Sequence, residues 1–371
     1  MACCPTEENY GYEDSRFEKA VDAHFHCSIC YNVLKEPMMC RNNEHIFWNE
    51  RENRKPCIQR RCRRREGKFQ ISSAINHASN MLMEDILVGG GWDSGENALK
   101  SVERFSWKKN VWKRVSSMNV GRVGATSFVY ENQLFVAGGC DSRVIEVLNL
   151  DEDPMQWGES MAKVPYHCQY LRSVVYQNRA GFFCGCNNND YCAELCLTAP
   201  YTCKQLCKMS DPTRINYTVV AFEHKVLVFG GSTADNNSLD SVLEFDVSTK
   251  EFKAMPSLPC ALEKAAAVRW GDEAILIGGA DKDGQTNRVF MYNSKTGNIT
   301  ELPPMKEERC GCAAIITGNT IVVMGGRGKT TGRVRSVEAF TLGGYSWRYL
   351  PAMNEIRSLP IATVLPTKNV R

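Results

Sequence analysis

The sequence has little of several features that would direct its function. No apolar run approaches the roughly 20 residues that a membrane helix needs, so we expect no membrane partner. The formal net charge is only +3 over 371 residues, which is too small to indicate a specific nucleic-acid partner. Histidine is scarce, with six residues in the chain. These absences argue against a membrane protein, a nucleic-acid binder and a histidine-based enzyme.

The N-terminal stretch lacks the apolar segment of a secretory signal. It begins "MACCPTEENYGYEDSRF", which is polar and acidic. We therefore expect the chain in the cytoplasm or the nucleus, where cysteines stay reduced. The 18 cysteines are then expected to be metal ligands, core thiols or exposed thiols before disulfides.

Charge is uneven in one place. Residues 51–68 carry a dense run of arginine and lysine with no aromatic residue inside it. A solvated basic linker fits this run, and so does a nuclear-targeting or electrostatic docking segment. The absence of interleaved aromatic residues weakens a base-stacking role.

From residue 82 onward the chain repeats one phrase about every 47 residues. A β-rich run ends in a glycine pair, and the third copy has lost one glycine to cysteine. The six copies are "ILVGGGWD" (86–93), "LFVAGGCD" (134–141), "FFCGCNNN" (182–189), "VLVFGGST" (226–233), "ILIGGADK" (275–282) and "IVVMGGRG" (321–328). Such periodicity is typical of repeat architectures.

A second phrase recurs in phase with the first. It begins with a strand such as "SVERF" (101–105) and contains a bulky residue at a fixed place, as at Trp112, Phe252 and Trp347. Each unit thus holds four short strand-length segments bounded by turn residues. Because one four-stranded sheet cannot bury its own faces, we expect the sheets to stack radially, with the bulky residues packed between neighbours.

These phrases resemble the kelch repeat, and the resemblance covers about three quarters of the chain. It implies an all-β fold, a six-bladed kelch β-propeller over residues 82–367. The first copy lacks the strand that precedes the others, whereas an extra apolar strand, "LPIATVLPT" (359–367), follows the last. We expect this C-terminal strand to complete blade 1, which would remove exposed sheet edges.

The loops at the channel mouth are the expected functional surface, because the residues of the strands are needed for packing between the sheets. The two propeller histidines, His167 and His224, lie in different blades, so both are expected in surface loops. Loops between blades repeatedly place an arginine just beyond a methionine. Radial symmetry predicts a cationic ring on the propeller face for an acidic protein target; pairing with local backbone is the alternative. The arginines are Arg122, Arg214, Arg309 and Arg357.

Cysteine is concentrated in the third copy. Spacings of two and four put pairs of these residues on one face of a strand. Free thiols that fill small core sites are the favoured interpretation, since a metal role lacks a CxxC spacing. The cluster comprises Cys168, Cys184, Cys186, Cys192, Cys196, Cys203 and Cys207.

The segment before the repeats has a different character. After a tail at 1–24, residues 25–66 contain "HCSICYNVLKEPMMCRNNEHIF", and a linker at 67–81 leads to the propeller. This segment resembles the front of a RING finger of TRAF-like ubiquitin ligases. The resemblance implies a groove for a ubiquitin-conjugating enzyme shaped by Ile29, Leu34 and Pro37.

The same resemblance implies zinc, but the ligand set is incomplete. Trp48 and Arg51 fall where the fifth and sixth ligands belong, and neither binds zinc. One zinc ion could be held by Cys40, His45, Cys57 and Cys62. Alternatively, Cys27 and Cys30 could recruit Cys57 and Cys62 into an irregular site, or the degenerate module could bind no metal; two ions are not expected. The candidate ligands are Cys27, Cys30, Cys40, His45, Cys57 and Cys62.

Two functions follow from these features. The first is a protein-interaction module, a kelch propeller that captures a target, in one form as the substrate-recognition part of a ubiquitin ligase. The alternative is an active RING-type ubiquitin ligase, which would position the charged conjugating enzyme without a covalent intermediate. An enzyme within the propeller lacks a convergent set of catalytic residues.

Overall fold

The computed structural model describes residues 83–366, apart from 141, 153, 169, 177, 187–188, 199–200 and 209–213, and, before them, the backbone of six short strands. Those strands pair in sequence order as three antiparallel hairpins or ladders. They are β1 (Gly11–Tyr12), β2 (Val33–Leu34), β3 (Pro37–Met39), β4 (Ile46–Trp48), β5 (Arg64–Arg65) and β6 (Lys68–Phe69). The predicted RING-like module otherwise lies outside the described residues.

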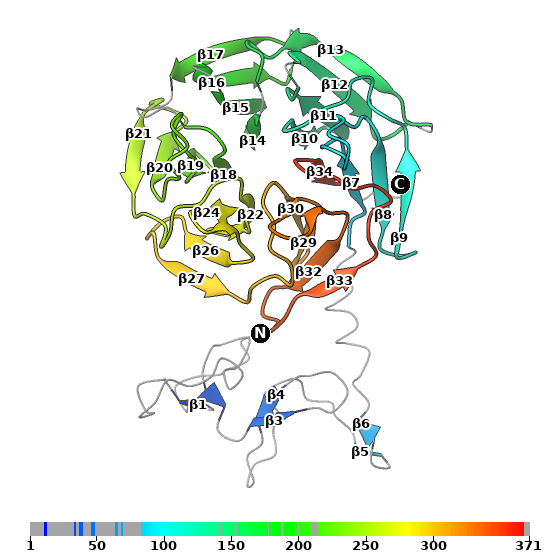
Figure 1. The fold of residues 1–371 in the computed structure, drawn as a ribbon, viewed down its shortest axis with the longest axis vertical. Coiled ribbons are helices and arrows are strands. Elements are labelled where there is room, and N and C mark those ends of the chain that lie inside the picture. The colour runs from blue at the N-terminus through cyan, green and yellow to red at the C-terminus, as the bar shows by residue number, and fades with distance from the viewer. Residues whose placement is uncertain are drawn as a thin grey trace. The chain divides into compact units, whose positions relative to one another are not determined.

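The chain divides into two compact units: Met1–Leu82 with Leu342–Tyr345, and Met83–Thr341 with Ser346–Arg371. Within the described part of the second unit, six four-stranded antiparallel sheets surround a central channel (Figure 1). The described residues contain strands and no helix. The all-β six-bladed propeller predicted from the repeats is confirmed.

The blades follow one another in chain order, each running from an innermost to an outermost strand. Blade 1 is the exception, because its innermost strand comes from the C-terminal end. Blade 1 comprises β34 (Ile361–Val364), β7 (Ile86–Gly89), β8 (Val102–Ser106) and β9 (Val111–Val115); blade 2 comprises β10 (Thr126–Tyr130), β11 (Gln133–Ala137), β12 (Val144–Asn149) and β13 (Trp157–Lys163); blade 3 comprises β14 (Arg172–Tyr176), β15 (Arg179–Cys186), β16 (Asn189–Cys196) and β17 (Cys203–Lys208).

The second half of the ring repeats this order, with a short extra hairpin on each of the last two blades. Blade 4 comprises β18 (Thr218–Phe222), β19 (Lys225–Phe229), β20 (Val242–Asp246) and β21 (Phe252–Met255); blade 5 comprises β22 (Ala266–Trp270), β23 (Glu273–Ile277), β26 (Val289–Asn293) and β27 (Ile299–Leu302), with the hairpin β24 (Ala280–Asp281) and β25 (Gly284–Gln285); blade 6 comprises β28 (Ala313–Thr317), β29 (Thr320–Met324), β32 (Val337–Thr341) and β33 (Arg348–Leu350), with β30 (Arg327–Gly328) and β31 (Gly332–Arg333).

The strand β34 closes the ring. It pairs antiparallel with β7, from Ile361 opposite Gly89 to Val364 opposite Ile86. Figure 1 shows the red C-terminal strand beside the teal β7 at the channel. First and last repeats thus share one sheet, which satisfies the edge of β7 that would otherwise be open.

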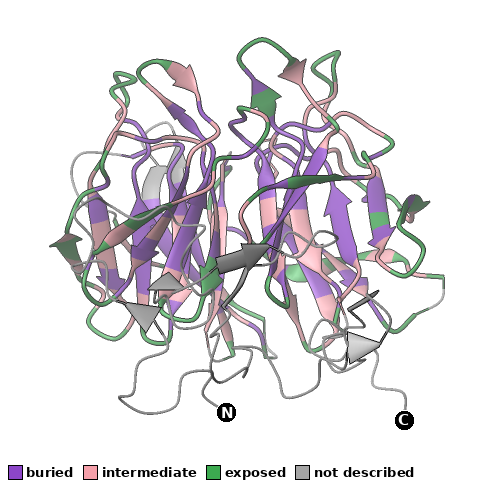
Figure 2. Ribbon diagram, turned by 90° about the horizontal axis from the view of Figure 1, so that it is seen from below, coloured by how far each residue is buried: buried purple, intermediate pink, exposed green. Residues whose placement is uncertain are grey.

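The core lies between the sheets. The second strand of each blade is almost wholly buried, whereas inner strands such as β18 alternate buried and half-buried positions. Figure 2 shows the buried strands packed in the body of the ring and exposed residues at its two ends. This is the arrangement expected when each sheet buries its faces against its neighbours.

The bulky residues of the second phrase pack between blades, as predicted. Trp112 of blade 1 is buried and its Nε1 donates to Pro351 O of blade 6 at 2.7 Å. Trp347 of blade 6 donates in the same way to Pro303 O of blade 5 at 2.8 Å. Each indole therefore fills an apolar site and satisfies its one donor across the blade boundary.

Candidate functional site

One end of the propeller carries both the segments that connect successive blades and the loops that follow the glycine pairs. Each connecting segment places one residue, here called the joint residue, between two blades. At five of the six joints its carbonyl accepts from the second glycine of the preceding blade, as in Gly91 N to Arg122 O at 2.7 Å. Its side chain points to the next blade. The joint residues are Arg122, Cys168, Arg214, Leu262, Arg309 and Arg357.

Arginine joints share one geometry. Arg122 donates from one terminal nitrogen to Gly138 O at 2.6 Å and from Nε to Glu146 at 2.9 Å. Glu146 in turn accepts from the backbone of Asn119 at 2.6 Å, in the same connecting segment. The cation therefore satisfies a strand-end carbonyl and a buried carboxylate together.

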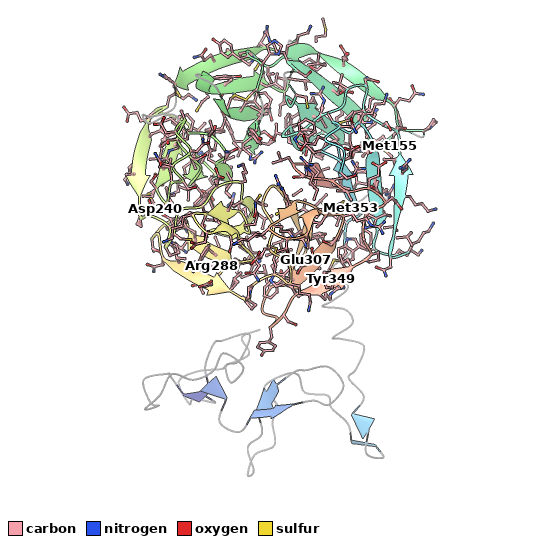
Figure 3. All side chains as sticks on the ribbon, in the orientation of Figure 1. Met155, Asp240, Arg288, Glu307, Tyr349 and Met353 are labelled. Carbon is pink, nitrogen blue, oxygen red and sulfur yellow. A yellow bond between two sulfur atoms is a disulfide. The ribbon has the colours of Figure 1, made fainter. Side chains whose placement is uncertain are left out.

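The other arginine joints repeat this geometry with one variation. Arg309 binds Gly325 O and Glu338, and Arg357 binds Gly90 O and Glu103. Arg214 binds Gly230 O but uses Ser241, because Leu243 stands where the glutamate would be. Figure 3 locates two of these connecting segments through their labelled residues, Glu307 in the segment that enters blade 6 and Met353 in the segment that enters blade 1.

These four arginines do not form the expected exposed ring. Arg122 is 1% exposed, Arg214 4%, and Arg309 and Arg357 0%. A partner at the surface cannot reach guanidinium groups that are already bound to buried carbonyls and to a carboxylate or, at Arg214, to Ser241. The prediction of a cationic target-binding ring is therefore wrong for these residues, and the alternative, pairing with local groups, is what the structure shows.

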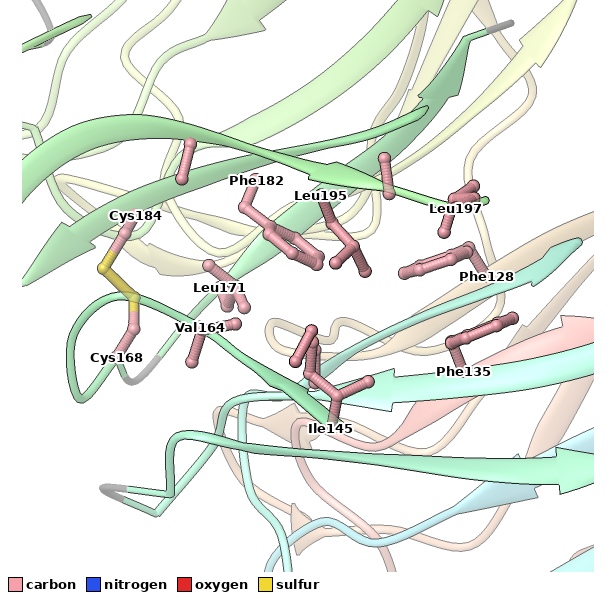
Figure 4. Packing of buried hydrophobic residues seen from close by; sticks show 14 of the residues in the cluster. Phe128, Phe135, Ile145, Val164, Cys168, Leu171, Phe182, Cys184, Leu195 and Leu197 are labelled. Atoms are coloured by element: carbon pink, nitrogen blue, oxygen red, sulfur yellow. A yellow bond between two sulfur atoms is a disulfide. The ribbon is translucent and has the colours of Figure 1, made fainter. Parts of the chain in front are cut away.

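Two joints dispense with arginine. Leu262 occupies the joint between blades 4 and 5. It shares an apolar cluster with Phe290, which stands in blade 5 where Glu146 stands in blade 2. At the joint between blades 2 and 3, Cys168 forms a disulfide with Cys184 (Figure 4). The expectation of reduced core thiols is wrong for this pair. Cys186 lies in β15, but its side chain is outside the described part of the structure.

Other thiols differ in environment. Burial raises the pKa of Cys203 to about 12 and that of Cys312 to about 12. Cys196 is half-buried, and hydrogen bonding to Thr198 lowers the pKa of its thiol. Apolar burial suppresses thiolate formation at the first two positions, whereas a hydrogen bond to the anion favours it at Cys196.

A ring of six residues, here called the collar, surrounds the channel mouth at the joint end. All six adopt the left-handed backbone region, with φ between 53° and 64°. Backbone bonds link five of them in succession, from Gly124 round to Asn216: Leu359 N, for example, donates to Gly311 O at 2.7 Å, and Gly311 N donates to Lys264 O at 2.8 Å. The collar consists of Gly124, Tyr170, Asn216, Lys264, Gly311 and Leu359.

The collar carries side chains of mixed chemistry. Tyr170, Lys264 and Leu359 are half-buried, and Lys264 Nζ lies 3.0 Å from Glu263 Oε1. Asn216 is buried and donates to Ser232 Oγ and to Glu263. The mouth therefore offers an aromatic, a cationic and an aliphatic group on a hydrogen-bonded backbone.

Residues just after the glycine pairs stand beside the collar. Trp92 is half-buried and pairs through its backbone with Ser358, while Arg327 is exposed and pairs with Cys310. The loops beyond are tied together, because Arg333 binds Glu96 at 2.8 Å and Lys329 donates to Asp283 O at 2.9 Å. These contacts fix the loops of blades 5, 6 and 1 relative to each other.

Away from the collar, a cavity of about 510 Å³ opens among the inner strands β14, β18 and β22. Its lining is mixed, with the aliphatic Val175, Val219 and Ala221 beside the charged Glu223 and Arg269. The guanidinium of Arg269 donates to Gly271 O and Ala221 O and lies 5.0 Å from the Phe222 ring. This lining offers binding area but no paired acid and base.

A second, polar cavity of about 320 Å³ lies between blades 3 and 4. At its wall Glu194 is 4% exposed, accepts from Tyr176 Oη at 2.7 Å and is bound by Arg179. Burial raises the pKa of Glu194, but these hydrogen bonds outweigh it and hold that pKa below its ordinary value. Glu194 is therefore a structural carboxylate.

The histidines and the predicted zinc ligands complete the account of the sequence candidates. His167 and His224 are exposed in loops, as predicted. The backbone of Leu34 lies in β2 and that of Pro37 in β3. Side chains of the RING-like candidates lie outside the described residues: Cys27, Ile29, Cys30, Leu34, Pro37, Cys40, His45, Cys57 and Cys62.

Two absences hold for the part of the chain with described side chains. No three histidine, cysteine, aspartate or glutamate residues gather there as metal ligands. No helix there is long and apolar enough to cross a membrane.

Two family models match the chain. The KLHDC2/KLHL20/DRC7 Kelch-repeats domain matches residues 201–364, and the Kelch motif matches residues 76–119. Together with the six-bladed architecture, these matches show that the propeller is built of kelch repeats, the resemblance first indicated by the glycine pairs.

Known proteins resemble parts of the chain. Kelch-like protein 25 of Xenopus tropicalis is 24% identical over 76% of this chain and 40% of its own length. Human Kelch-like protein 38 is 22% identical over 66% and 42%, and Kelch repeat and BTB domain-containing protein 2 of cowpox virus (strain GRI-90 / Grishak) is 29% identical over 30% and 20%. The chain thus matches from a fifth to about two fifths of these relatives' lengths.

A solved structure, that of YjhT, has the same fold. It aligns with a TM-score of 0.57 and 14% identity, over 67% of this chain and 89% of that one. At that identity the likeness concerns the fold alone.

Proposed function

We propose that the propeller is a protein-interaction module that binds a protein target over the collar and the loops beside it. The observation that carries this proposal is the presence of large side chains in the left-handed backbone region at Tyr170, Lys264 and Leu359. The equivalent positions Gly124 and Gly311 supply the same backbone without a side chain.

The energetic argument is direct. A left-handed conformation costs a residue with a Cβ roughly 1–2 kcal/mol relative to the ordinary helical region, whereas glycine adopts it freely. Strained residues of this kind cluster at ligand-binding sites. Tyr170, Lys264 and Leu359 therefore keep side chains where folding alone would favour glycine.

The neighbouring residues suit a protein partner. Trp92 and Arg327 lie next to the collar, and both residue types are enriched where interfaces derive most of their binding energy. The loops beside them are held by the Arg333–Glu96 and Lys329–Asp283 contacts. A surface fixed in advance loses less entropy on binding.

The test separates binding from folding. Full-length wild-type chain and the variant Y170G/L359G are used to capture proteins from cells of the source organism, with Trp270→Ala at the other channel mouth as the control. We expect the double variant to keep its unfolding free energy, or to gain up to about 1 kcal/mol, and to lose at least tenfold of its captured partner. Equal capture by the double variant would refute the collar as the binding face.

The finer proposal is that this target-binding propeller serves as the substrate-recognition part of a ubiquitin ligase in the cytoplasm or nucleus. Its support is the RING-like segment 25–66, with Ile29 between Cys27 and Cys30 and with Leu34 and Pro37 nearby. As a second candidate, the segment recruits a ubiquitin-conjugating enzyme and acts as an active ligase.

Zinc content and autoubiquitination decide between the two. The incomplete ligand set, with Trp48 and Arg51 at ligand positions, predicts zero or one zinc ion per full-length chain. Two ions together with autoubiquitination that Ile29→Ala abolishes would establish the active ligase. A chain with at most one ion and no such activity is a target-binding component.

A further inference from the structure

The joint between blades 2 and 3 is built differently from the other five. In the arginine joints, the arginine and the first glycine of the next blade are 16 residues apart, as with Arg122 and Gly138. Cys168 and Cys184 are also 16 residues apart. Cys168 therefore stands at the position of the arginine and Cys184 at the position of the glycine.

The backbone on each side supports this equivalence. Cys168 O accepts from Gly139 N at 2.9 Å, just as Arg122 O accepts from Gly91 N. Cys184 takes the place of the first glycine, and β15 continues through it to Cys186. Opposite, Ala193 stands where Glu146 binds Arg122 in blade 2. Cys168 and Ala193 thus replace the arginine and the glutamate of the joint that enters blade 2.

Apolar side chains surround the disulfide. Cys168 and Cys184 are both 0% exposed and belong to the cluster between blades 2 and 3, with Leu171 and Phe182 (Figure 4). The disulfide is the covalent link between these two side chains, in the place of an arginine–glycine contact. It adds to the backbone bond from Gly139 N to Cys168 O at the same joint.

We propose that Cys168 and Cys184 form a redox-modifiable site that sets the strength of the joint between blades 2 and 3. The co-reactant is a small-molecule disulfide such as oxidised glutathione. One cysteine thiolate attacks it and releases one glutathione thiol. The second cysteine then attacks the mixed disulfide and releases the other. Two cysteine thiols lose two protons and two electrons, and one glutathione disulfide becomes two thiols.

The environment sets the kinetics of this exchange. Because both sulfur atoms are fully buried, reduction requires transient opening of the joint, and it is slower than reaction at half-buried Cys196. In a compartment with a reducing glutathione pool, such a bond acts as a redox sensor rather than a permanent crosslink.

The test uses the full-length chain equilibrated in oxidised or reduced glutathione buffers. Non-reducing peptide mapping should find the Cys168–Cys184 link in the oxidised sample, and thermal unfolding should show a Tm lower by roughly 5 °C or more after reduction. The variant C168S/C184S should show no dependence of Tm on the buffer.

A second variant tests the equivalence to an arginine joint. C168R/C184G/A193E rebuilds the contacts of Arg122, Gly138 and Glu146, and its Tm should lie above that of C168S/C184S and be insensitive to reductant. Failure of this variant to fold would overturn the equivalence. Separate Cys168 and Cys184 thiols in the oxidised sample, or an unchanged wild-type Tm on reduction, would overturn the redox site. These readouts do not depend on target binding.

Discussion

Arg122 and Glu146 form a fully buried ion pair between the segment entering blade 2 and its third strand, with Nε and a terminal nitrogen each 2.9 Å from the carboxylate. The same side chain binds Gly138 O. One residue thereby joins the connecting segment, the end of β11 and the middle of β12. Residues once expected to bind a partner hold the ring together instead.

Removing the arginine should be costly. Arg122→Ala leaves Glu146 buried without its cation, so we expect the free energy of unfolding to fall by about 3–5 kcal/mol. Lys295→Ala, which breaks the solvent-exposed pair with Asp272, should change it far less. Urea unfolding measures both.

The apolar joint between blades 4 and 5 supplies a matched design. The variant R122L/E146F copies Leu262 and Phe290 and removes both charges together. It should be more stable than Arg122→Ala, because no unpaired charge remains. A double variant less stable than the single one would contradict this account of the joints.

The first glycine of each pair should not tolerate a side chain. Gly90 has a φ of 62°, and a Cβ there would lie 2.6 Å from Arg122 O. Gly90→Ala should therefore cost roughly 2 kcal/mol or more. At Gly158 in β13 the nearest atom to such a Cβ is 4.0 Å away, so Gly158→Ala should be neutral or slightly stabilising. Similar losses at both sites would refute the steric explanation.

Glu194 predicts a specific dependence of stability on acid. Its pKa is below the ordinary value of about 4.3 in the folded chain. Its contribution is therefore present above that ordinary value and lost as pH falls through the folded pKa. Glu194→Gln should be less stable than wild type at pH 7, and the difference should shrink below about pH 4. A difference that grows on acidification would reverse the assigned sign.

Thiol reactivity should follow the pKa differences. Cys196 should be alkylated by iodoacetamide faster than Cys203 and Cys312, whose pKa values of about 12 suppress the thiolate near neutral pH. Time-resolved peptide mapping of the folded full-length chain measures the order. Cys312 reacting before Cys196 would contradict the described environments.

The repeat and its closure were predictable because they depend on local patterns. A glycine pair bounds a strand wherever it occurs, and the extra strand near 361–364 has one free partner, β7. The burial of the arginines was harder to foresee, since it depends on residues 24 to 29 positions later or, for Arg357, on Glu103 in the first blade. A signal was present: Glu103, Glu146 and Glu338 occupy one place in the second phrase.

The collar was missed for a different reason. Left-handed backbone is predictable at Gly124 and Gly311, but nothing in the identities of Tyr170, Lys264 and Leu359 suggests it. Only alignment of the segments before each inner strand brings the two glycines into register with the other residues. Predicting the disulfide also required this alignment, because Cys168 and Cys184 are recognised as a pair only when they are aligned with Arg122 and Gly138.

Site-specific photo-crosslinking tests the central claim, target binding at the collar end, most directly. A photoreactive phenylalanine analogue replaces Trp92 beside the collar or, as the matched control, Trp270 at the end of β22, in otherwise wild-type full-length chain. The account predicts a discrete crosslink to the captured partner from position 92 and none from position 270. A crosslink from position 270 alone would contradict it.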